Sequence, residues 1–152
     1  MTKQLGQSIG DHAYGQAWSS ELRRVALQCV DNAAPDDPSL IRDAHRLLSG
    51  SPAAADDLVG VLPARKLIEA LLTLRAYESA ALRMLPEQLG YLLSRGPGRS
   101  YWLASSCLEG RNEDVTCRAS SAAAALLGAY LSELAEFFEA KSTTWPLRSA
   151  LN

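Results

Sequence analysis

Few side chains in this 152-residue sequence have the type and spacing that catalysis or metal binding requires. Its two histidines, His12 and His45, do not lie three or four residues from a cysteine or from each other, so zinc-ligand spacing is missing. The carboxylate pairs Asp36-Asp37 and Asp56-Asp57 each adjoin an expected helix start, where acidic residues commonly act as caps. We therefore predict no metal site and no cofactor.

Nucleophilic catalysis also lacks a local signature. No G-x-S-x-G sequence occurs, and Ser49-Gly50-Ser51-Pro52 is typical of a turn. Neither Cys107 nor Cys117 has an activating motif beside it. Together with Cys29 they make an odd number of thiols, which favours free cysteines in a reducing compartment. We expect no catalytic residues and no enzyme activity.

The stretch with the strongest functional signal is RGPGRSYW, residues 95–102. Arginine, tyrosine and tryptophan are enriched at interface hot spots, and here they border a glycine–proline turn. This pattern predicts partner-binding roles for Arg95, Arg99, Tyr101 and Trp102. The alternative is that the two aromatic residues anchor a short helix in the core.

A second candidate surface is an acidic row near the C-terminus. Glu133, Glu136 and Glu139 recur at intervals of three within an expected helix, opposite Leu134 and Phe138. Like charges near a helix C-terminus oppose the helix dipole, so local physics does not explain the row. We predict a solvated acidic patch, which is either a plain surface face or, as a partner-binding candidate, a contact for a basic partner.

Charge is distributed unevenly, although the net charge of -2 is close to neutral. From Arg65 to Arg111 there are seven basic and four acidic residues, a local excess of three positive charges that would orient a charged partner. This basic stripe is sparser than that of most nucleic-acid platforms. The N-terminal residues lack the apolar core of a signal peptide, and the longest apolar run, Ala122 to Leu131, is about half a membrane span. We expect a cytoplasmic protein without a membrane partner.

Leucine and alanine dominate the apolar residues, which make up 47% of the chain and favour helices. Hydrophobic periodicity extends that expectation along the whole sequence. The predicted helices run from Ser8 or Asp11 to about Asn32, Pro38 to Leu48, about Ala54 to Val61, Pro63 towards Pro86, Pro86 to Leu93, about Ser100 to Leu108, and about Asp114 to Lys141.

The predicted fold is therefore all-α, a compact bundle of about six or seven helices with one long C-terminal helix and no sheet. We expect a single helical domain over residues 1–152, with flexible or docking ends at about 1–8 and 142–152. Within the long helix, residues 118–129 read RASSAAAALLGA, and Ser120, Ala124 and Gly128 form a row of small side chains. Such a row lets a neighbouring helix approach closely. It predicts a central strut of the bundle or, as the alternative, the seam of a homodimer.

These observations favour a non-catalytic protein that binds another protein as an adaptor, subunit or stoichiometric inhibitor. In its format, which is short, compact, slightly acidic and poor in motifs, the chain resembles phage-encoded inhibitors of bacterial defence complexes such as anti-CRISPR proteins. That resemblance implies a protein complex as the partner. The second hypothesis is a nucleic-acid-binding accessory protein that uses the Arg65 to Arg111 region. The third is an enzyme or small-ligand carrier with a site assembled by the fold.

Overall fold

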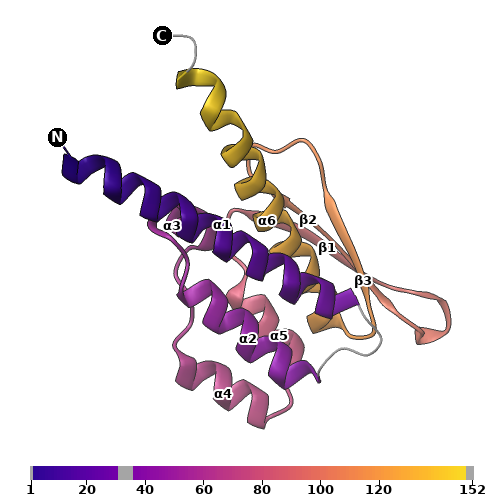
Figure 1. Cartoon of the computed structure of the whole chain (residues 1–152). Coiled ribbons are helices and arrows are strands. Elements are labelled where there is room, and N and C mark those ends of the chain that lie inside the picture. Colours follow the sequence, from indigo (N-terminus) through magenta and orange to yellow (C-terminus); the bar gives the residue numbers. More distant parts are fainter. Residues whose placement is uncertain (1, 31–35, 150–152) are drawn as a thin grey trace.

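The computed structural model describes residues 2–30 and 36–149, and the surroundings of side chains over residues 10–30, 36–98 and 100–140. Over these residues the chain forms six α-helices and a three-stranded antiparallel sheet (Figure 1). The prediction of an all-α fold without a sheet is therefore wrong. The elements are α1 (Thr2–Val30), α2 (Asp37–Ser49), the 3₁₀ turn η1 (Ala53–Ala55), α3 (Asp56–Val59), α4 (Arg65–Thr73), α5 (Tyr77–Met84), β1 (Leu89–Arg95), the 3₁₀ turn η2 (Pro97–Arg99), β2 (Trp102–Leu108), β3 (Val115–Ala119) and α6 (Ala122–Ser149).

The sheet replaces two predicted helices and the start of a third. Residues 89–95 and 102–108 pair as β1 and β2 in an unbroken antiparallel register, and residues 115–119 add β3 on the other side of β2. Each strand is too short for hydrophobic periodicity to separate strand from helix. The glycine-containing turns decide the outcome, because Gly98 and Gly110 adopt positive φ angles of 64° and 84° where the chain reverses direction.

Helix α6 lies between α1 and the sheet, and α2, α4 and α5 pack below them in Figure 1. The closest approach is at Gly128 of α6. A Cβ atom there would overlap the Cys117 sulfur of β3 and lie 2.9 Å from the Cys29 Cβ of α1. Of the small-residue row, Ala124 and Gly128 are packed within the chain, as the strut prediction requires, whereas Ser120 is exposed. The buried part of this face is covered by the chain's own elements rather than open as a dimer seam.

The N-terminal helices match the sequence pattern more closely. Trp18, Leu22, Val25 and Cys29 recur at steps of four and three along α1 and are buried, whereas Tyr14, one turn before Trp18, is half exposed. Helix α2 is capped one residue earlier than its proline suggested, since the Asp36 carboxylate accepts a hydrogen bond from the Ser39 amide at 3.0 Å. Among the helices of the described residues, none is long and apolar enough to cross a membrane.

The helix predicted from Pro63 towards Pro86 is divided into α4 and α5. Between them Arg75 adopts a positive φ of 56°, which a continuous helix does not allow. The break turns α5 inward, so that Ala80, Ala81 and Met84 are buried, while α4 keeps only Ile68 and Leu72 in the core. The outer side of α4 is consequently left with leucine side chains in solvent.

Candidate interaction site

The predicted partner-binding stretch lies at the turn between β1 and β2, which projects beyond the end of β3 in Figure 1. Arg95 ends β1 and pairs with Trp102 at the start of β2, so both side chains lie on the same face of the sheet. The Arg95 guanidinium carbon is 5.1 Å from the centroid of the Trp102 ring. This distance is that of a cation–π contact.

The opposite face of this turn carries a second arginine on an aromatic ring. The Arg118 guanidinium carbon of β3 lies 3.8 Å from the centroid of the Tyr101 ring. On its other side the same ring rests against Gly96, where an added Cβ would come within 2.5 Å of the ring carbons. Because Gly96 has no side chain, the Tyr101 ring can lie against it. The Gly96 amide donates to the Tyr101 carbonyl oxygen at 2.9 Å.

We call Arg95, Tyr101, Trp102 and Arg118 the hairpin cluster. Both aromatic side chains are half-buried, and Trp102 packs against the core. The alternative of a short helix here is wrong, because residues 102–108 form β2. The ion pairs seen within the described side chains involve arginines other than Arg95 and Arg118. The side chain of the fourth predicted residue, Arg99, lies outside the described residues. Sequence reasoning missed Arg118 because it placed that residue in a helix rather than in the strand beside the turn.

The acidic row does not form a solvated patch. Glu133 is fully buried and accepts hydrogen bonds from the Ser106 hydroxyl at 2.8 Å and from the Leu108 amide. Glu136 lies 3.5 Å from the Arg111 guanidinium, and Glu139 is bound by both nitrogens of the Arg23 fork, at 2.9 and 3.1 Å. That hydrogen bond lowers the pKa of the Glu139 carboxyl. The prediction of one exposed acidic surface is corrected accordingly.

The burial of Glu133 follows from the unequal lengths of the strands. Strand β3 pairs with β2 only as far as Ser106, opposite Val115. The Leu108 amide points to the same side of β2, where β3 no longer supplies a carbonyl oxygen. The Glu133 carboxylate of α6 takes that place, so an acidic side chain completes the sheet instead of facing solvent.

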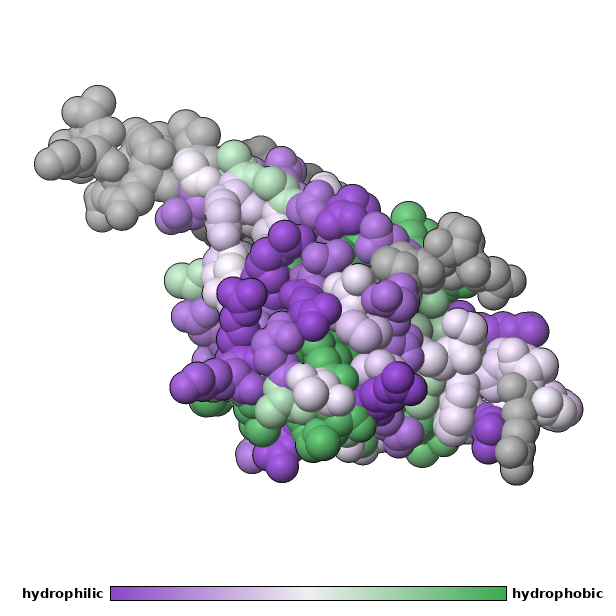
Figure 2. Space-filling model, turned by 90° about the horizontal axis from the view of Figure 1, so that it is seen from below, coloured by the Kyte–Doolittle hydropathy of each residue, from purple (hydrophilic) through white to green (hydrophobic). Residues whose placement is uncertain are grey.

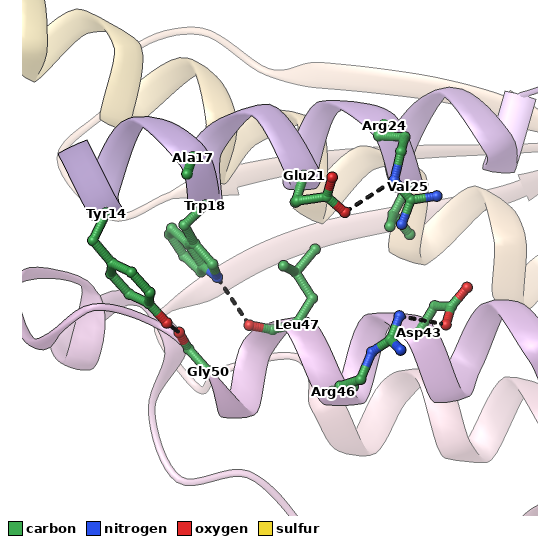
Figure 3. Close-up of a pocket in the computed structure, with 10 residues that line it drawn as sticks. All are labelled: Tyr14, Ala17, Trp18, Glu21, Arg24, Val25, Asp43, Arg46, Leu47 and Gly50. Carbon is green, nitrogen blue, oxygen red and sulfur yellow. Dashed lines mark hydrogen bonds and ion pairs between the residues drawn. The ribbon is translucent and has the colours of Figure 1, made fainter.

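A groove of about 350 Å³ lies between α1 and α2 (Figure 3). Its charged side chains are paired within their own helices, Glu21 with Arg24 and Asp43 with Arg46, each at 2.9 Å. The Trp18 indole donates to the Leu47 carbonyl at 2.8 Å, across the groove from one helix to the other. These polar groups hold the helices together and do not converge on a common point.

The remaining candidates for chemistry are also engaged elsewhere. In a second groove of about 530 Å³, between α2 and α4, the His45 ring nitrogen lies 2.8 Å from the Pro63 carbonyl oxygen. Burial raises the pKa of the Cys117 thiol to about 11 and that of Cys29 further, so both are neutral at pH 7. Over the residues that the structure describes, no group of three or more His, Cys, Asp or Glu side chains could hold a metal ion.

Three apolar side chains at α4 are exposed to solvent. Val61, Leu67 and Leu74, which lie in α4 or beside its two ends, are 100%, 40% and 76% exposed. Figure 2 shows hydrophobic side chains on the lower side of the molecule, bordered by hydrophilic ones. We call these three residues the α4 patch. Exposed apolar groups of this kind commonly mark interaction surfaces.

The hairpin cluster and the α4 patch are two exposed surfaces of the described residues. The first combines charge with aromatic rings, and the second is apolar alone. Comparison with protein-family models, with curated proteins and with solved structures gave no match to this chain.

Proposed function

We propose that this protein acts by binding another protein through the hairpin cluster. The observation that carries the proposal is the pair of arginines at the end of one hairpin, each held against an aromatic ring. Neither arginine takes part in the ion pairs seen within the described side chains. A partner surface with carboxylates at matching positions fits this arrangement.

Stacking favours such binding for two reasons. A guanidinium held on a ring keeps its N–H groups at the edge, where they can bind a carboxylate with two parallel hydrogen bonds. A side chain that is already held also loses less conformational entropy when a complex forms. Arginine, tyrosine and tryptophan are the residue types that most often dominate binding energy at interfaces.

The proposed role is that of an adaptor, subunit or stoichiometric inhibitor. A phage-type inhibitor of a bacterial defence complex, such as an anti-CRISPR protein, is one form of this proposal, based on the format of the chain. We further propose that the protein acts in the cytoplasm. All three cysteines are free, and two of them are buried thiols suited to a reducing compartment.

Reversing both charges of the hairpin cluster is expected to weaken partner binding. In Arg95→Glu/Arg118→Glu the acidic partner surface would meet like charges, so we expect at least a tenfold loss of captured partner in quantitative affinity capture from the native host. The matched control is Arg24→Glu/Arg46→Glu, which makes the same charge change in the α1–α2 groove and is expected to keep capture. Circular dichroism of both variants checks that the fold is retained.

Two outcomes would overturn the proposal. Equal capture by the cluster variant and the wild type would remove this surface from consideration. The nucleic-acid hypothesis would instead be supported if nuclease treatment removed all captured material and binding weakened steeply with salt.

A further inference from the structure

Strand β1 is an edge of the sheet, because it pairs with β2 on one side and with no other strand of the described residues. The Gly96 amide donates to the Tyr101 carbonyl oxygen. Along an antiparallel strand the main-chain groups of successive residues point alternately towards the partner strand and away from it, so this bond fixes which residues of β1 face β2. Gly90, Leu92 and Ser94 therefore direct their main-chain groups towards β2. Tyr91, Leu93 and Arg95 direct theirs outward, to the free edge.

This edge lacks the features that usually keep sheet edges from pairing. Natural edge strands are protected by charged residues, proline or bulges. Residues 89–94 read LGYLLS, without a charge or a proline, and the register with β2 runs unbroken from Leu89 to Arg95. Tyr91 is 46% exposed and Leu92 is 74% exposed. A regular strand whose charge is confined to its last residue, Arg95, and whose outer hydrogen-bonding groups are open is suited to receive another strand.

We propose that the occupant is β1 of a second copy of this chain, paired antiparallel about a two-fold axis at Leu93. The two sheets then form one continuous six-stranded sheet. Leu93 lies opposite Leu93 of the second copy, and Tyr91 lies opposite Arg95 of the second copy. All three outward residues of each strand take part, which gives about six main-chain hydrogen bonds across the axis.

Complementarity between arginine and an aromatic ring favours this register. It places Arg95 against a tyrosine ring, repeating the arginine–aromatic contact that the sheet already makes twice. An axis at Arg95 would oppose two like charges. An axis at Tyr91 or at Leu92 would require main-chain hydrogen bonds to Leu89 across the interface. The Leu89 amide already donates to the Pro86 carbonyl oxygen at 3.1 Å, so it is not open to a second strand. An axis at Ser94 would set Tyr91 opposite Pro97, which has no amide to donate. The axis at Leu93 uses the open groups of all three outward residues and keeps the arginines apart.

The dimer is a separate claim from binding at the hairpin cluster, and different residues test it. Tyr91 and Leu93 belong to the proposed dimer and not to the cluster, whereas Arg118 on β3 belongs to the cluster alone. If both hold, the two hairpin clusters flank the two-fold axis, with Arg95 of each copy opposite Tyr91 of the other. A dimer would then present two copies of the partner-binding surface.

Sedimentation velocity of the purified chain, from micromolar to millimolar concentration, tests the dimer. We expect a concentration-dependent monomer–dimer equilibrium. Tyr91→Lys sets a second cation opposite Arg95 and should raise the dimer dissociation constant at least tenfold. Tyr91→Glu sets a carboxylate there and should leave the constant unchanged or lower it. Leu74→Lys in the α4 patch is the control and should have no effect.

Oxidative cross-linking tests the register. Leu93→Cys should form a covalent dimer, since opposed residues on antiparallel strands lie within the Cα separation of a disulfide. Leu74→Cys should not, and circular dichroism checks that each variant is folded. A protein that stays monomeric throughout would overturn the proposal. So would a dimer that responds equally to Tyr91→Lys and Tyr91→Glu.

Discussion

Replacing Glu133 with alanine is expected to lower the free energy of unfolding by about 3 kcal/mol, because it leaves buried polar groups without partners. The carboxylate accepts hydrogen bonds from the Ser106 hydroxyl and the Leu108 amide, in a position without access to solvent. Alanine removes both acceptors at once and leaves a cavity between α6 and the end of the sheet. Urea denaturation followed by circular dichroism measures the loss.

Two further substitutions separate this effect from the loss of a charge. Glutamine at position 133 can accept from the Leu108 amide and donate to the Ser106 oxygen, so Glu133→Gln should cost about 1 kcal/mol or less. Glu136→Ala removes only a half-exposed contact with Arg111, for which a loss below about 1 kcal/mol is expected. Equal stabilities for all three variants would contradict the role assigned to Glu133.

Gly128→Ala is expected to destabilise the protein by about 2 kcal/mol, as overpacking of a filled core does. In a helix with room for a methyl group, the same change would instead gain up to about 1 kcal/mol. At Gly128 the methyl group would overlap the Cys117 sulfur and crowd Cys29, so α6 would have to move away from α1 or β3. Thermal or urea unfolding gives the difference directly.

A matched glycine and a second-site change make this prediction specific. Gly15 in α1 has nothing within 4 Å of an added Cβ, so Gly15→Ala should raise stability by about 0.5–1 kcal/mol. Cys117→Ala removes the overlapping sulfur and should recover part of the loss when combined with Gly128→Ala. If Gly128→Ala stabilises the protein as Gly15→Ala does, the close contact of α6 with α1 and β3 is wrong.

Hydrophobic periodicity located the helices that bury one row of apolar side chains, but it did not locate the strands. Trp18, Leu22 and Leu40 follow a helical repeat that burial reproduces. In β2 the inward positions are Ala104, Ser106 and Leu108, so a polar residue interrupts the apolar alternation that identifies a strand. The Ser106 hydroxyl donates a hydrogen bond to the Glu133 carboxylate. The two residues are 27 positions apart in the sequence, so no local pattern reveals the pair.

The candidate site was predictable in part for the same reason. Arg95, Tyr101 and Trp102 lie together in sequence, and the glycine–proline turn between them is a local signal that the structure confirms. Arg118 reaches Tyr101 only because β3 lies beside β2, which is a consequence of sheet pairing. The acidic row was misplaced because helical spacing gives the relative directions of side chains but not the face that meets the sheet.

Site-specific photo-crosslinking tests the central claim most directly. A photoreactive amino acid is placed at Leu103, which pairs with Arg118 beside the hairpin cluster, or at Leu74 in the α4 patch. We predict that the probe at position 103 crosslinks one host protein, and that the crosslink is lost when Arg95 and Arg118 are changed to glutamate. A crosslink from position 74 with none from position 103 would contradict the account and assign the interface to α4.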